Sequence, residues 1–103
     1  MYNNMHNESL EFEWDDLKNV RNILKHDLSF EVAESVFLDN GRIVLPDERH
    51  SLDEDRFLCI GETGEGIATV CFTVRKEKIR IISAGYWRKG RRRYERKKRN
   101  NLH

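Results

Sequence analysis

The alternation of apolar and polar residues predicts a short strand and then a helix at the start of the chain. Residues 10–14, LEFEW, alternate apolar and acidic side chains, which is the period of a half-buried strand. In the segment that follows, apolar residues recur at spacings of three and four: Leu17, Val20 and Leu24. Asp15 and Asp16 provide an N-cap and a negative first turn, while Lys25 and His26 suit a helix C-terminus.

A second helix is predicted from Ser29, whose hydroxyl can serve as its N-cap. Its apolar residues also recur at helical spacing and form one stripe: Phe30, Ala33, Val36 and Phe37. The pair Asn40-Gly41 is a stop signal for this helix.

Four later apolar runs predict strands, at residues 43–45, 56–61, 67–74 and 79–84. Pro46 ends the first run or places it at a sheet edge. The last three runs are joined by the short turns ETGEG and RKEK, so we expect an antiparallel meander. The predicted order is β-α-α-β-β-β-β-α, an α+β domain with two helices packed on one face of a small antiparallel sheet.

Alternation within the last strand divides its residues between the two faces of the sheet. The two sets are Ile79, Ile81 and Ser83 on one side and Arg80, Ile82 and Ala84 on the other. Arg80 is therefore expected mid-sheet, on a face whose other occupants are apolar.

Charge is distributed unevenly along the chain. The overall charge is +1, but residues 88–101, RKGRRRYERKKRNN, hold nine Lys or Arg and the single acid Glu95. Such a block is typical of a nucleic-acid-binding arm or helix, or of a tail that balances an acidic body. We expect a basic helix from about Lys89.

Residues 1–9, MYNNMHNES, are polar and aperiodic and are predicted to be a disordered extension, which leaves residues 10–103 as a single domain. Cys59 and Cys71 lie in apolar runs without CxxC spacing, so we expect two buried thiols in a reducing cytoplasm. No apolar run approaches the length of a membrane span.

Candidate chemistry centres on cations. The histidines lack metal-ligand spacing and the acids of residues 47–55 suit a solvated loop, so we expect no cofactor and no metal. RNA can be cleaved without metal, because its 2′-hydroxyl is the nucleophile and the protein needs proton-transfer groups and cations. His50, Arg56, Arg75 and Arg80 are candidates for these roles, although each arginine alone can also be explained by a surface ion pair.

Aromatic residues interleave with the basic tail. Tyr86, Trp87 and Tyr94 can stack on unpaired bases, or can fold back onto the sheet instead. The tail cations nearest these rings are candidate RNA-binding residues: Arg88, Lys89, Arg91 and Arg92.

Several motifs in register resemble one family. FEWDDLKNVRNILKHDLSFEVAESVF at residues 12–37 is followed by PDERHSLDEDRFLCIG at 46–61, RIISA at 80–84 and RRRYE at 91–95. The chain resembles the BrnT family of bacterial type II toxins over this whole span.

The resemblance implies a RelE-like α+β fold and a metal-independent endoribonuclease that inhibits translation. It also implies neutralisation by a BrnA-like antitoxin, binding of operator DNA only through the antitoxin complex, and a homodimer within that complex. Carried over by position, it favours an active site at His50, Arg56, Arg80 and Tyr94.

Two positions depart from the family pattern. Asp27 stands where a glycine is usual after the first helix, so Asp must take the left-handed conformation there. Gly85 stands where the family's last strand usually continues with arginine, and Arg88 or Lys89 is a candidate substitute. The alternative to an active enzyme is therefore a weakened toxin or a non-catalytic module that binds RNA or an antitoxin.

Overall fold

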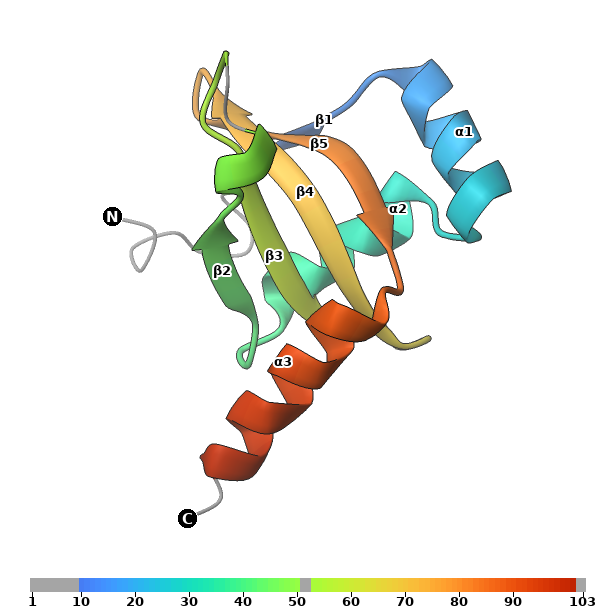
Figure 1. The fold of residues 1–103 in the computed structure, drawn as a ribbon. Coiled ribbons are helices and arrows are strands. Elements are labelled where there is room, and N and C mark those ends of the chain that lie inside the picture. Colours follow the sequence, from blue (N-terminus) through green and yellow to red (C-terminus); the bar gives the residue numbers. More distant parts are fainter. Residues whose placement is uncertain (1–9, 51–52, 102–103) are drawn as a thin grey trace.

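The computed structural model describes residues 10–50 and 53–101, so the predicted N-terminal extension lies outside the described residues. The fold is α+β, as predicted, with N-terminal helices packed on a mostly antiparallel sheet and a C-terminal helix (Figure 1). The strands are β1 (Phe12–Glu13), β2 (Ile43–Pro46), β3 (Phe57–Glu62), β4 (Ile67–Arg75) and β5 (Lys78–Gly85). The helices are α1 (Asp16–His26), α2 (Phe30–Ala33) and α3 (Arg88–Asn100), with 3₁₀ turns η3 (Glu34–Leu38) and η4 (Glu48–His50).

The five strands form one sheet in the order β1-β5-β4-β3-β2. Strands β3 to β5 form the predicted antiparallel meander, and β2 pairs antiparallel with β3. The first predicted strand is shorter than expected, and β1 pairs with β5 in parallel through Phe12 opposite Ile79 and Glu13 opposite Arg80.

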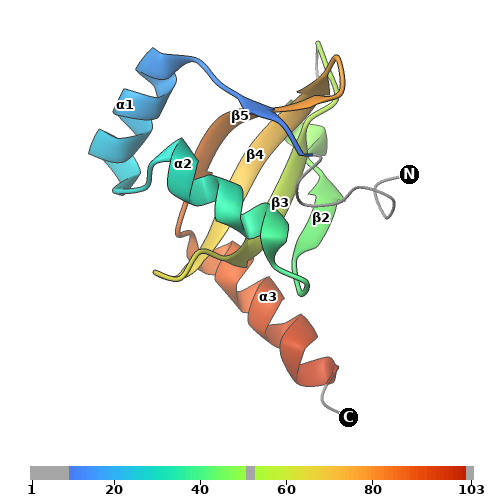
Figure 2. The ribbon, with the colours of Figure 1, turned by 180° about the vertical axis from the view of Figure 1, so that it is seen from behind.

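The hydrophobic core lies between one face of the sheet and the segment formed by α2 and η3 (Figure 2). The predicted stripe of the second helix is confirmed, because Phe30, Ala33, Val36 and Phe37 are all buried there. Only its first turn is α-helical, however, and it continues as 3₁₀ helix to Leu38.

A β-bulge in β5 changes which side chains lie on each face. Cys71 pairs with Ser83 and Phe72 with Ile81, so Ile82 is an extra residue. Ala84 consequently joins Ile79 and Ile81 in the core, whereas Ser83 lies on the opposite face. The strict alternation predicted for this strand holds as far as Ile82 and is wrong for Ser83 and Ala84, because a bulge reverses the phase of the strand.

The start of α3 packs closely against the sheet face that lies opposite the core. A Cβ atom on Gly90 would lie 2.0 Å from Thr69 Oγ1 and 3.7 Å from Ile60. A residue without a side chain is therefore required for the helix to approach β3 and β4 at this distance.

A second contact fixes α3 one turn later. The Tyr94 hydroxyl donates a hydrogen bond of 2.6 Å to Asp39 Oδ2, which also accepts one from the Glu62 backbone N–H. Burial, the largest influence on Asp39, raises its pKa, but the hydrogen bonds from Tyr94, Glu62 and Gly41 and the nearby Lys98 leave that pKa below its ordinary value. Burial, together with the hydrogen bond to Asp39 and its charge, raises the pKa of Tyr94 to about 12.

Replacing Tyr94 with Phe is expected to lower the free energy of unfolding near neutral pH by about 1.5–3 kcal/mol, since the lost hydrogen bond has a charged acceptor. Tyr94 stabilises the fold fully below its ordinary pKa of 10.0, and this stabilisation is lost as pH rises towards about 12. Asp39 stabilises the fold at pH values above its ordinary pKa of 3.8. This stabilisation is lost as pH falls through the lower pKa that Asp39 has in the folded protein.

Urea unfolding measured from acidic to alkaline pH should show that the wild type loses stability at alkaline pH, whereas Tyr94→Phe does not show this loss. Asp39→Asn is the companion variant, and it should not show the loss of stability at acidic pH. Superimposable alkaline curves for wild type and Tyr94→Phe would contradict the assignment.

Gly90→Ala is expected to destabilise the protein by about 1–3 kcal/mol through overpacking against Thr69, although Ala favours a helix by about 1 kcal/mol. In a Thr69→Ala background the clash is removed, so the same substitution should become neutral or stabilising. Thermal unfolding of the four proteins of this cycle measures the coupling. Additive effects would show that Gly90 is not placed by Thr69.

Candidate active site

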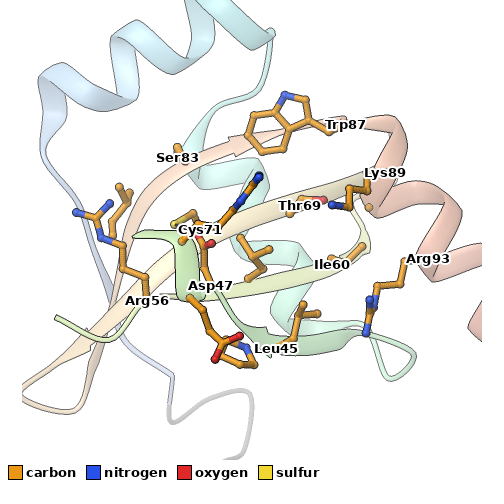
Figure 3. Close-up of a pocket in the computed structure, with 16 residues that line it drawn as sticks. Leu45, Asp47, Arg56, Ile60, Thr69, Cys71, Ser83, Trp87, Lys89 and Arg93 are labelled. Carbon is orange, nitrogen blue, oxygen red and sulfur yellow. Dashed lines mark hydrogen bonds between the residues drawn. The ribbon is translucent and has the colours of Figure 1, made fainter. Parts of the chain in front are cut away.

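A hollow of about 560 Å³ lies on the sheet face opposite the core, between the start of α3 and the β2–η4 segment (Figure 3). Strands β3, β4 and β5 form its floor, and α3 closes one end. Its lining residues are Leu45, Pro46, Asp47, Glu48, Arg49, Arg56, Leu58, Ile60, Thr69, Cys71, Ile82, Ser83, Trp87, Lys89, Gly90 and Arg93.

Four cationic side chains line the hollow, and they come from three parts of the chain. Arg49 comes from η4, Arg56 precedes β3, and Lys89 and Arg93 lie on successive turns of α3. Figure 3 shows Arg56 and Lys89 at opposite ends of the hollow. An anionic chain lying across the floor would therefore meet cations on both sides.

Apolar side chains occupy the floor between these cations. Leu58, Ile60 and Ile82 point to this face, and for Ile82 this is the face that the alternation along the strand predicts. An apolar floor, with a rim that carries these four cations and the acids Asp47 and Glu48, can accept a nucleotide, whose base is flat and whose phosphate is charged.

Trp87 lies at the rim and is 40% exposed. Its ring covers Gly85, since a Cβ there would lie 2.5 Å from Trp87 Cε2. The Trp87 ring also meets the His26 ring of α1 in an edge-to-face arrangement, with ring centroids 5.2 Å apart. The arginine that the resemblance leads one to expect at position 85 is thus replaced by a glycine with an indole ring over it.

Three of the predicted arginines form ion pairs with glutamates. Arg75 donates to Glu54 Oε1 through both Nε at 3.2 Å and Nη2 at 2.9 Å, and Arg56 Nε lies 3.7 Å from Glu54 Oε2. The hydrogen bond from Arg75 is the main reason that the pKa of Glu54 is lowered, and Arg80 contributes through its charge. Arg80 itself is paired with Glu13 at 3.3 Å.

The predicted catalytic residues are only partly brought together. Arg56 lines the hollow, whereas Arg80 and Tyr94 are not among its lining residues, and the Tyr94 hydroxyl is bound to Asp39. His50 ends η4, whose residues Glu48 and Arg49 line the hollow, but its side chain lies outside the described part of the chain.

The predicted RNA-binding residues lie in three different settings. Lys89 lines the hollow, while Arg88, Arg91 and Arg92 are exposed on α3 and Arg75 is held by Glu54. Arg93 and Arg49 line the hollow but were not singled out from the sequence. The i, i+4 spacing of Lys89 and Arg93, with Gly90 between them, could have indicated Arg93 as a residue on the same helix face.

The two thiols are buried, as expected, and point to opposite faces of the sheet. Cys59 belongs to the core, where burial raises its pKa to about 12. Cys71 faces the hollow beside Asp47, and burial together with the Asp47 charge raises its pKa to about 11. Both thiols are therefore protonated at neutral pH, so Cys71 is a poor nucleophile.

Within residues 10–50 and 53–101, no three His, Cys, Asp or Glu side chains are grouped as metal ligands. None of the helices in the same ranges combines the length and the apolar character needed to cross a membrane.

Comparison with known proteins gives the family of the chain. A search of curated proteins found no match to this chain. The family model described as "Ribonuclease toxin, BrnT, of type II toxin-antitoxin system" matches residues 14–90, which include β3, β4, β5 and the first turn of α3. The chain therefore belongs to the BrnT family of ribonuclease toxins of type II toxin–antitoxin systems.

Proposed function

We propose that this chain is itself an endoribonuclease that cleaves RNA without a metal ion and thereby inhibits translation. The observation that carries the proposal is the hollow on the open face of the sheet, where Arg56, Lys89 and Arg93 surround an apolar floor beside Trp87. The family supplies the reaction class, and an RNA substrate and a cognate antitoxin follow from it.

The reaction uses the RNA's own nucleophile. The 2′-oxygen attacks the neighbouring phosphorus and the bond to the 5′-oxygen breaks, which leaves a 2′,3′-cyclic phosphate and a 5′-hydroxyl end. Negative charge accumulates on the phosphate in the transition state. We assign the stabilisation of that charge to Arg56, Lys89 and Arg93, which all line the hollow.

Proton transfer is assigned to His50, because its neighbours in η4 line the hollow and imidazole titrates near neutral pH. Tyr94 acts as a positioning residue, since its hydroxyl donates to Asp39 and its raised pKa keeps it protonated. It holds α3, and with α3 the side chains of Lys89 and Arg93, against the sheet.

The remaining arginines extend the binding surface. Arg75 and Arg80 lie beyond the hollow and are tied to Glu54 and Glu13, so a phosphate bound there would share their positive charge with these acids. Exposed α3 cations continue the surface in the other direction: Arg88, Arg91 and Arg92. RNA is proposed to lie across the open face from this end of the molecule towards Arg80.

The partners follow from the same proposal. A BrnA-like antitoxin neutralises the toxin, and operator DNA is bound only through the complex, which contains two copies of the toxin. The site of action is the cytoplasm, where translated RNA is found.

Purified protein freed of antitoxin is expected to cleave single-stranded RNA in the presence of EDTA and to leave 5′-hydroxyl ends. Arg56→Ala should lower kcat/KM by about 10²- to 10³-fold, since one transition-state cation is lost. His50→Ala should reduce cleavage while leaving the affinity for a non-cleavable 2′-O-methyl oligonucleotide unchanged.

Arg21→Ala is the matched control, because Arg21 is an exposed arginine on α1. It should cleave RNA at the wild-type rate. RNA that is bound but left intact by the wild type would favour the non-catalytic binding module, and RNA that is neither bound nor cut would overturn the proposal.

Trp87 is expected to stack on an unpaired base at the rim of the hollow. Loss of base stacking is worth about 1–3 kcal/mol, so Trp87→Ala should weaken binding of the 2′-O-methyl oligonucleotide about 5- to 150-fold, with Trp87→Phe intermediate. Tyr86→Ala is the control, because Tyr86 is 37% exposed but does not line the hollow. Fluorescence anisotropy measures the affinities, and equal values for Trp87→Ala and wild type would exclude this role.

A further inference from the structure

Helix α1 turns its apolar residues to solvent. Leu17, Val20 and Leu24 follow one another at spacings of three and four, so they form one row along the helix. Their exposed fractions are 56%, 50% and 82%, and the neighbouring Ile23 is 40% exposed. Figure 1 shows α1 on the β5 side of the sheet, and hydrogen bonds between Asn19 and the first residues of α2 join the two helices.

The opposite row of the same helix is polar and faces the protein. It consists of Asn19, Asn22 and His26, which are the least exposed residues of α1. Asn22 is buried and donates to Leu28 O at 2.8 Å and to Ala84 O at 2.9 Å, and it accepts from the Ala84 N–H at 3.2 Å.

These contacts set the rotation of α1 about its axis. Turning the apolar row inward would break the three buried hydrogen bonds of Asn22 and the one that Asn19 accepts from the Phe30 N–H. Buried amide groups left without partners are costly, so the outward orientation is the stable one. The exposed apolar row is therefore built into the folded chain.

A row of cations runs beside the apolar row. Lys18, Arg21 and Lys25 have the same spacing as Leu17, Val20 and Leu24, one residue later, and all three are exposed. A surface that is apolar along its centre and positive along one side is complementary to an amphipathic helix with an acidic border.

We propose that the apolar row of α1 is a docking surface for an amphipathic segment of the cognate antitoxin, whose apolar side chains cover Leu17, Val20 and Leu24 and whose acidic residues face Lys18, Arg21 and Lys25. This inference rests on neutralisation by an antitoxin, as proposed above. A second copy of the chain is a poorer match, because antiparallel packing of two α1 helices would set the basic row beside itself.

The test uses the antitoxin co-expressed with the chain from their own operon, separated from it and titrated back. Val20→Glu and Leu24→Glu should each weaken the complex at least 10-fold by calorimetry, because each puts a carboxylate into an apolar contact that is bordered by acids. Arg21→Glu with Lys25→Glu should weaken it as well, and should remove part of its salt dependence.

Leu38→Glu is the matched control, since Leu38 is a 49% exposed leucine on η3 and not on α1. It should bind the antitoxin with wild-type affinity. Unchanged affinity of the α1 variants would overturn the inference, as would light scattering that showed the free chain to be a dimer that Leu24→Glu dissociates. RNA cleavage by the free Leu24→Glu protein should equal the wild type, so a failure of docking is distinguishable from a failure of the nuclease proposal.

Discussion

The carboxylate of Asp39 joins three parts of the molecule, and the open face of the sheet depends on it. It accepts hydrogen bonds from the Gly41 N–H in the turn before β2, from the Glu62 N–H at the end of β3 and from the Tyr94 hydroxyl of α3. Tyr94 is only 5% exposed, so this charged acceptor lies beside a well-packed ring. Because α3 carries Lys89 and Arg93, the same contact determines where two cations of the hollow lie.

The sheet can serve both a core and a site because its two faces are chemically different. On the core face α2 and η3 cover apolar side chains, and on the other face Ile82 lines the hollow and the bulge turns Ser83 towards it as well. Gly90 then lets α3 approach Thr69 closely enough to close one end. The hollow thus lies between the start of α3 and the β2–η4 segment, and the close approach of α3 depends on the missing side chain of Gly90.

Local features were predictable from the sequence, whereas tertiary ones were not. Asp15 caps α1 as expected, with its carboxylate accepting from the Leu17 and Lys18 N–H groups, and Asp27 takes the left-handed conformation at φ 54°. Period-two alternation carries no sign of a bulge, so Ser83 and Ala84 of β5 were assigned to the wrong faces. The rotation of α1 about its axis could not be predicted from the sequence either, because it depends on a hydrogen bond from Asn22 to Ala84 of β5, which lies 62 residues later in the chain.

The orientation of α1 also links the apolar row on this helix to the hollow on the sheet. Most helices in proteins are stabilised by burying an apolar face, but α1 is held by the amide of Asn22 and by the contact of His26 with Trp87. A partner that covers the apolar row would add the missing burial and stabilise the helix by mass action. His26 would be stabilised with it, and so would the indole ring over Gly85 at the rim of the hollow. Under the docking proposal, an antitoxin segment on α1 therefore acts next to the RNA site while the floor of that site stays open.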